Sequence, residues 1–257
     1  CTGGEPWTEK PWKWLFQVIG KSKVPIMNSA GGTEVSGSIL HCCLHRPFKV
    51  GSFNAPIPGM SADILNLDGK KVSTNEMGEL VMRKSSIGLT KSLWNDDKRY
   101  IDNYWSVIKD YWVHGDLASR DTDGHWYLHG RSDDTIKVSG KRIGPSELES
   151  VIVKSGKAKE VAAVGIPDAN KGSKIILSIV PAENNDQKES FFEDLVIKDL
   201  GKSFKPDKVI FVKDLPKTRN MKIMRRVIKS CLANQDPGDL STLLNPESVE
   251  EIRSHAI

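Results

Sequence analysis

The sequence predicts a mixed α/β protein in two parts, and three observations support this prediction. Short strands with turn residues between them dominate the region 51–130. After it, the pattern changes to a hairpin, a helix and apolar strands, which is typical of a compact α+β domain. The length of 257 residues suits two domains. We therefore expect a first part at 1–130, a connection at 131–134 and a second domain at 135–257.

The first part contains a Trp-rich helix, glycine loops and strands. The segment "PWKWLFQVIG" has apolar residues at helical spacing and ends at Gly20, a favourable helix stop. "VPIMNSAGGTE" predicts a short buried strand that runs into a glycine loop. "SADILNL" and "GELVMR" predict strands, with the turn "DGKK" between them, and "DTDGHWYLHGR" predicts a hairpin. These strands indicate a partial sheet plus a small β-barrel or folded sheet.

The second part starts with the predicted hairpin "TIKVSGKRIG". "PSELESVIVKSG" predicts a helix, because Pro145 suits a first turn and Gly156 a helix stop. "EVAAVGI", "KIILSIV" and "KVIFVKDL" predict strands, and a further helix is expected at about 189–200. The last predicted helix, "KIMRRVIKSCL", carries an apolar stripe, and little periodicity follows Asn234.

Composition favours an ordinary globular protein. Hydrophobic residues make up 38% and charged residues 27% of the chain. No run approaches the roughly 18 apolar residues that a membrane span needs, and the start shows no secretory signal. Four cysteines, two of them adjacent, make a poor disulfide framework, so we expect a reducing, cytoplasmic location. Because the sequence lacks an initiator Met, we also expect it to begin inside a longer reading frame.

Two local patterns each have two explanations. From Lys198 to Lys229 there are eleven basic residues and three acidic ones. This excess indicates a polyanionic partner, either a small molecule's phosphates or nucleic acid, but a solvated lysine-rich face has the same composition. In "HCCLH", the side chains of His41, Cys43 and His45 would share one face of a strand and suit Zn²⁺. No fourth ligand is evident, and packing of buried cysteine is the more ordinary explanation of the segment.

Three polar segments suit phosphate and ribose chemistry. In "GGTE", two glycines allow a close approach, and the hydroxyl and carboxylate that follow suit a phosphate and its Mg²⁺. Asp116 follows a glycine in "YWVHGD", where a carboxylate can accept hydrogen bonds from two ribose hydroxyls. In "LPKTRNMKIMRR", Lys222 is placed to reach outward as a cationic donor. Taken singly, each signal is weak: a plain turn explains "GGTE" better, a cap or turn would explain Asp116, and a solvated lysine would explain Lys222.

In this order and spacing, the segments resemble the adenylate-forming superfamily, and most of all AMP-forming acyl-CoA synthetases of the acetyl-CoA synthetase type. The likeness covers residues 1 to about 235 and is most specific in "YWVHGDLASRDTDGHWYLHGRSDDTIKVSGKRIGPSELES". It implies that the first part is the C-terminal part of a large adenylate-binding domain and the second a small mobile lid. It also implies that ATP activates a carboxylic acid to acyl-AMP and PPi, and that CoA then takes the acyl group and releases AMP. ATP/AMP, Mg²⁺ and CoA are the implied cofactors.

The resemblance also implies roles for single residues. Lys222, Thr33 and Glu34 match catalytic positions, with Glu34 as the Mg²⁺ ligand, and Asp133 matches the hinge between the domains. The matches to nucleotide-binding positions are Gly4, Glu5, Pro6, Asn28, Asp116 and Arg131. The matches to positions that line the CoA path are Gly140 and Arg142.

Three departures from the family pattern matter. The glycine-rich Ser/Thr phosphate loop does not occur in this sequence, so we expect this chain alone not to form adenylate at a useful rate. Asn220 and Met221 stand where the family usually has Ser-Gly before the lysine. Gly31 stands where acetate-specific relatives have Trp, which predicts space for an acyl group larger than acetyl unless another aromatic fills it. Each buried methylene there would contribute about 0.8 kcal/mol.

Two rival functions fit parts of the sequence. A non-catalytic nucleotide- or CoA-binding module would carry the same matched residues, and the missing phosphate loop favours it for this chain. A nucleic-acid binder would use the basic run, but only Phe204 and Phe211 are aromatic there, so we expect no nucleic-acid partner. The sequence leaves the oligomeric state open.

Overall fold

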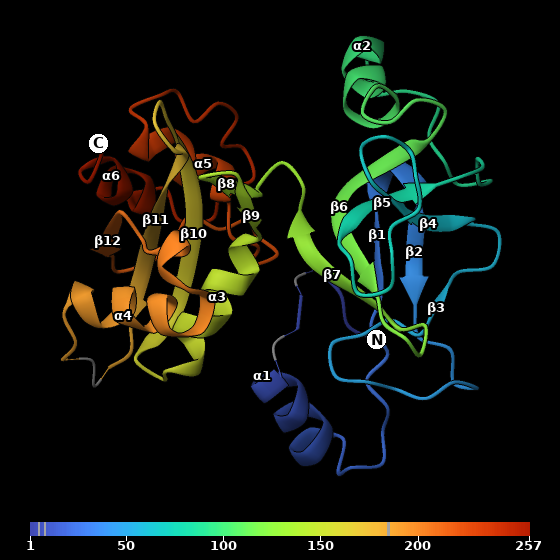
Figure 1. Ribbon diagram of the computed structural model, residues 1–257, viewed down its shortest axis with the longest axis horizontal. Coiled ribbons are helices and arrows are strands. Elements are labelled where there is room, and N and C mark those ends of the chain that lie inside the picture. The colour runs from blue at the N-terminus through green and yellow to red at the C-terminus, as the bar shows by residue number, and fades with distance from the viewer. Residues whose placement is uncertain (5, 8, 184–185) are drawn as a thin grey trace. The chain divides into compact units, whose positions relative to one another are not determined.

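The computed structural model describes the chain except for residues 5, 8, 184 and 185. It forms two compact units, Cys1–Asp133 and Asp134–Ile257 (Figure 1). Each unit combines helices with β-sheet, which confirms the mixed α/β prediction. Among the described residues, the helices are all too short or too polar to cross a membrane.

The first unit consists of helical turns and two antiparallel sheets. The opening helix α1 (Glu9–Trp14) continues as a π-helical turn, Leu15–Ile19, and ends at Gly20 as predicted. The second helix, α2 (Asp97–Tyr100), also continues as a π-helical turn, Ile101–Trp105. The sheets have the strand orders β1-β2-β3 and β4-β5-β6-β7. Their strands are β1 (Ala30–Gly32), β2 (Gly37–His41), β3 (Ala55–Pro56), β4 (Ala62–Leu65), β5 (Gly78–Met82), β6 (Trp112–Arg120) and β7 (Trp126–Arg131).

The sheets of this unit are open rather than closed into a small barrel. Among the strands of the described part of the chain, β4 pairs with β5 alone at one end of its sheet, and β7 lies at the other end beside β6. A separate antiparallel bridge joins Phe53 to Trp126 of β7. The short strand predicted to start near Val24 is also displaced, because β1 begins only at Ala30.

The second unit is a three-stranded sheet that is buried on both faces. β10 (Ala158–Asp168) pairs antiparallel with β11 (Gly172–Pro181), which pairs parallel with β12 (Lys208–Phe211). One face packs against α3 (Pro145–Lys154) and α4 (Glu189–Leu200), and the other against α5 (Arg225–Leu232) and α6 (Glu247–Arg253). Burial on both faces explains why the sequence of each long strand is almost continuously apolar.

Two differences from the predicted elements concern the end of the chain. The last predicted helix starts at Arg225 and not at Lys222, so Lys222 lies in the preceding loop. Beyond Asn234, where little periodicity is visible, the structure has the additional helix α6, whose Val249 and Ile252 are buried against the sheet. Seven residues give too few turns for a helical period to show in the sequence.

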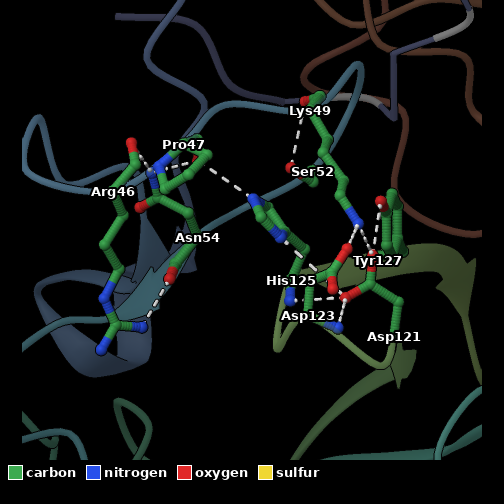
Figure 2. Close-up of polar contacts among 9 residues, drawn as sticks. All are labelled: Arg46, Pro47, Lys49, Ser52, Asn54, Asp121, Asp123, His125 and Tyr127. Atoms are coloured by element: carbon green, nitrogen blue, oxygen red, sulfur yellow. Dashed lines mark hydrogen bonds and ion pairs between the residues drawn. The ribbon is translucent and has the colours of Figure 1, made fainter.

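A polar cluster fixes the loop between β2 and β3 to the turn between β6 and β7 (Figure 2). Asn54 orders the loop, since its side chain accepts a hydrogen bond from the amide of Cys43 and donates to the carbonyl of Pro47. Lys49 Nζ lies 2.6 Å from Asp121 Oδ2 and 2.5 Å from Asp123 Oδ2. These contacts join segments that are more than 70 residues apart in sequence.

The same loop argues against the zinc site considered for "HCCLH". β2 ends at His41, so the strand alternation that would align Cys43 and His45 with it does not continue. Within the described residues, no three His, Cys, Asp or Glu side chains are grouped to hold a metal ion. The buried Cys42 donates from Sγ toward the carbonyl of Ser52 at 3.5 Å, which is a packing role.

Asp121 makes this cluster sensitive to acid. Desolvation raises the pKa of Asp121, but hydrogen bonds from Lys49, the His125 amide and Tyr127 outweigh it and lower the pKa from 3.8 to about 2. A folded-state pKa below the unfolded value stabilises the fold above the unfolded pKa. This contribution is therefore complete only well above the unfolded pKa of 3.8 and is lost progressively as the pH falls through 3.8 toward 2.

We expect Lys49→Met to lower the free energy of unfolding near neutral pH and to lower it much less at about pH 2.5, where Asp121 is largely protonated in the unfolded chain. Urea denaturation of both proteins across this pH range measures the difference. Lys70→Met, at an exposed turn, is the matched control. An equal loss at both pH values would contradict the assigned ion pair.

Candidate functional site

Asp116 and Arg131 face each other across β6 and β7, beside a bulge in their pairing. The guanidinium Nη1 lies 3.7 Å from Asp116 Oδ1 and donates to the His114 carbonyl at 3.0 Å. Its Nε donates to Asp133 Oδ1 at 3.1 Å. Burial lowers the pKa of Arg131, but the charges of Asp133 and Asp116 outweigh it and raise the pKa above its ordinary value. The pair therefore offers a carboxylate and a fixed cation side by side.

Gly115 makes this arrangement possible. Its φ is +82°, and a Cβ there would lie 2.7 Å from a terminal nitrogen of Arg131. Any side chain would therefore push the guanidinium away and strain the backbone. Ser132 fastens the strand end, because its amide donates to the Gly115 carbonyl at 2.9 Å and its hydroxyl to Glu79 Oε2 at 2.6 Å.

Glu34 joins the same site through Gly32 and His114. Glu34 lies half-buried in the turn Thr33–Val35, while Thr33 is exposed. A Cβ on Gly32 would meet Glu34 Oε2 at 3.1 Å and His114 Cε1 at 3.3 Å. The other link is His114 Nε2, which lies 3.2 Å from Asp116 Oδ2. The structure thus brings together three residues that the sequence named: Glu34, Asp116 and Arg131.

Two further residues of this site, His114 and Tyr104, were not identified from the sequence. The His114 side chain has the i, i+2 spacing from Asp116 that places both on one side of a strand, and this signal was available. Tyr104 comes from the π-helical turn after α2, and its ring stacks on Trp112 with centroids 5.2 Å apart. Burial, followed by the charge and hydrogen bonding of Glu34, raises the pKa of Tyr104. Nothing in the sequence pairs Tyr104 with Glu34.

The donor set around Glu34 fits a magnesium ion that is held mainly by phosphate. Mg²⁺ prefers oxygen ligands and commonly binds through one or two carboxylates plus substrate phosphates and water. The site offers the Glu34 carboxylate and the exposed Thr33 hydroxyl. It offers no closed metal cage, since no three metal-binding side chains cluster in the described part of the chain.

The segment expected to lie along adenine is next to Asn28 in the structure. Thr2 pairs with Asn28 in a parallel bridge, and Gly4 and Pro6 are exposed just beyond it, while Glu5 lies outside the described residues. The Asn28 side chain is 3% exposed and donates to the Gly51 carbonyl at 3.3 Å. Asn28 is therefore already bound to protein groups.

The surroundings of Gly31 bear on the expected acyl space. A Cβ at this position would lie 2.0 Å from the Gly37 carbonyl oxygen and 2.5 Å from Ser38 Cα. The backbone of β2 fills the place of a side chain, because β1 and β2 pair closely at a register shift. The glycine is thus explained by strand pairing, and the absent indole does not by itself leave room for methylenes.

In the second unit, two hairpins carry the remaining matched residues. Gly140, with φ +80°, and Ser139, with φ +49°, form the two-residue turn between β8 (Ile136–Val138) and β9 (Lys141–Ile143). Arg142 is exposed on β9. Lys222 is exposed in a second tight hairpin, where Lys217 bridges to Ile223 and the amide of Thr218 donates to the Lys222 carbonyl at 2.9 Å.

Met221 occupies a left-handed conformation in this hairpin, with φ +62°. Glycine adopts it without the cost of about 1 kcal/mol that a side chain pays, although glycine also increases the entropy of the unfolded chain. We expect Met221→Gly to keep or raise the thermal unfolding temperature and Met221→Val to lower it, because β-branched residues tolerate this conformation worst. A Gly variant less stable than the Val variant would contradict the assigned backbone.

Comparisons with known proteins agree with this architecture. The family model for AMP-binding enzymes matches residues 1–94, and the model for the AMP-binding enzyme C-terminal domain matches 147–222. The acetyl-coenzyme A synthetase of Methanothrix soehngenii is 37% identical over 97% of this chain, and that of Helicobacter pylori is 38% identical over 98%. The chain spans 38% and 40% of these two relatives.

A search of solved structures gives the same fold. Acetoacetyl-CoA synthetase from Streptomyces lividans superposes with a TM-score of 0.83 at 22% sequence identity. The match covers 98% of this chain and 39% of that one. The two family models, which together match residues 1–94 and 147–222, and the curated relatives show that the chain belongs to the AMP-binding enzymes.

Proposed function

We propose that the whole protein to which this sequence belongs is an AMP-forming acyl-CoA synthetase. In the first step, a carboxylate oxygen of the acid attacks the α-phosphorus of ATP, the bond to the β-phosphate oxygen breaks, and acyl-AMP and PPi form. In the second step, the CoA sulfur attacks the acyl carbon, the thiol proton is lost, and AMP leaves. The observation that supports this most is the site of Glu34, Asp116 and Arg131 in one unit, followed in the next by an exposed lysine hairpin.

The first unit would bind the nucleotide. Asp116 would accept hydrogen bonds from the two ribose hydroxyls, and Arg131, fixed by Asp133 and the His114 carbonyl, would contact the same sugar. Glu34 and Thr33 would hold Mg²⁺ on the phosphates, and a bound Mg²⁺ neutralises charge on them. Gly4 and Pro6 would line adenine, with Glu5 between them. Asn28 would have to release a protein contact to join them.

The second unit would supply different groups to the two steps. Lys222 would stabilise the negative charge that develops at the α-phosphate during adenylation. For thioester formation, rotation about Asp133 would replace it with the hairpin of Gly140, whose open turn would let the CoA arm pass beside Arg142. The division between the two units directly after Asp133 supports a pivot there.

The products of the whole protein test this function. With ATP, Mg²⁺, CoA and a carboxylic acid, we expect AMP, PPi and acyl-CoA in equal amounts, measured by chromatography. Acetate, propionate and longer acids are compared to identify the acyl group that the enzyme prefers. Binding of ATP or CoA without any of these products would instead favour the non-catalytic binding module.

A further inference from the structure

The backbone of Lys222 is held by one residue, Thr218. The Thr218 amide donates to the Lys222 carbonyl at 2.9 Å, and the Lys222 amide donates to Thr218 Oγ1 at 3.2 Å. The Thr218 carbonyl accepts from the Met221 amide at 2.8 Å. The position of Thr218 therefore determines where the Lys222 side chain leaves the backbone.

Thr218 is in turn held by the end of the chain. It forms an antiparallel bridge with Leu243, the amide of Leu244 donates to the Lys217 carbonyl at 2.8 Å, and the amide of Arg219 donates to the Thr242 carbonyl at 3.3 Å. Residues 217–219 thus lie between the Lys222 strand of the hairpin and residues 242–244. This end segment lies beyond the part of the chain that the family model matches.

Asn245 fastens the end segment with its whole amide group. Its Nδ2 donates to Asp214 Oδ2 at 2.7 Å and to the Leu215 carbonyl at 2.8 Å, and its Oδ1 accepts from the Lys217 amide at 3.0 Å. The residue is 7% exposed, so water cannot replace these bonds without opening the structure. The Ser248 hydroxyl donates to the Asn245 carbonyl at 2.6 Å, at the start of α6.

Lys217 anchors the base of the hairpin to the sheet. Its Nζ lies 2.6 Å from Glu160 Oε2 on β10 and 2.6 Å from Asp214 Oδ1, and its side chain is 7% exposed. Burial lowers the pKa of Lys217, but hydrogen bonds with Asp214 and Glu160 outweigh it and raise the pKa. Lys217, at the base of the hairpin, is therefore held in two ways: its side chain by ion pairs with Glu160 and Asp214, and its backbone amide by Asn245.

We infer that the end segment 242–248, through Asn245 and Thr218, positions Lys222 for the adenylation step. This inference rests on the proposed function. Asn245 and Thr218 would then be positioning residues for adenylation. They would have no part in thioester formation, because that step would not use Lys222. A displacement of about 1 Å at a reacting group can lower a rate by up to about 10²-fold.

The test measures the two half-reactions of the whole enzyme separately. For Asn245→Ala we expect acid-dependent ATP–PPi exchange to fall by about tenfold or more, while conversion of synthetic acyl-AMP and CoA to acyl-CoA stays within about twofold of wild type. Gln235→Ala, an exposed amide residue in the same end region, is the matched control and should change neither rate. An equal fall in both half-reactions, or none in either, overturns the inference.

Thr218 keeps the inference testable if Asn245→Ala does not fold. Thr218→Val removes the oxygen that accepts from the Lys222 amide, whereas Thr218→Ser retains it. We expect selective loss of ATP–PPi exchange in the Val variant and normal exchange in the Ser variant. Normal exchange in both variants, with exchange lost in Lys222→Ala, overturns the inference and leaves the proposed function intact. Undiminished exchange in Lys222→Ala overturns both.

Discussion

Lys222→Ala in the whole enzyme is expected to lower the rate of acyl-adenylate formation by about 10²–10³-fold, the usual effect of removing one preorganised donor from a charged transition state. The proposed reaction would concentrate negative charge on the α-phosphate, and the exposed Lys222 hairpin would present a compact cation to it. Acid-dependent exchange of labelled PPi into ATP measures this step without CoA. We expect KM for ATP to change less than kcat, because Lys222 would act mainly in the transition state.

The control for this variant is Lys229→Ala, which removes an exposed lysine from α5 of the same unit. It lowers the net charge equally, so it separates the local effect of Lys222 from attraction of ATP by the basic surface. Conversion of synthetic acyl-AMP to acyl-CoA should continue in both variants. If Lys222→Ala forms adenylate as fast as Lys229→Ala, the role proposed for Lys222 is wrong.

The sequence predicts the second unit better than the first, and the reason is burial. Residues 158–168 and 172–181 are buried on both faces, so their apolar runs are nearly unbroken and indicate strands directly. In the first unit, β1 has three residues and β3 has two, too few for alternation to be visible. Whether such strands close into a barrel depends on pairings between distant segments, which the local pattern does not contain.

In the candidate site too, contacts between distant segments could not be predicted from the local sequence pattern. Asp116 stands out as a carboxylate after a glycine, and Arg131 through the family resemblance, and the structure pairs the two across β6 and β7. Tyr104 does not stand out, since its contact with Glu34 depends on how the turn after α2 packs against the unit. The close approach of the Gly37 carbonyl to Gly31 is a further case, because it becomes visible only when the strands are paired. Asn245 was missed for the same reason, since its side chain bonds to Asp214, Leu215 and Lys217, about 30 residues earlier, only in the fold.

The second large effect is expected at Asp116. In Asp116→Ala we expect KM for ATP to rise by about 10²-fold, because hydrogen bonds to a charged acceptor contribute about 1.5–3 kcal/mol each. The structure offers a matched control in Asp68→Ala, an exposed aspartate in the turn after β4. Asp116→Asn keeps the size of the side chain but replaces one acceptor oxygen with a donor, so it should be impaired nearly as strongly.

Loss of affinity alone would not separate ribose binding from a structural role, since Asp116 also lies beside His114 and Arg131. Deoxynucleotides that lack one ribose hydroxyl distinguish ribose binding from a structural role. Wild-type enzyme should use 2′-deoxy-ATP and 3′-deoxy-ATP with KM at least about tenfold higher than ATP, because each lacks one hydroxyl that Asp116 would bind. Asp116→Ala should discriminate much less among the three nucleotides, since the missing hydroxyl no longer has a partner to lose. If the variant keeps the full wild-type preference for ATP, Asp116 does not bind the ribose, and the contact must be assigned elsewhere.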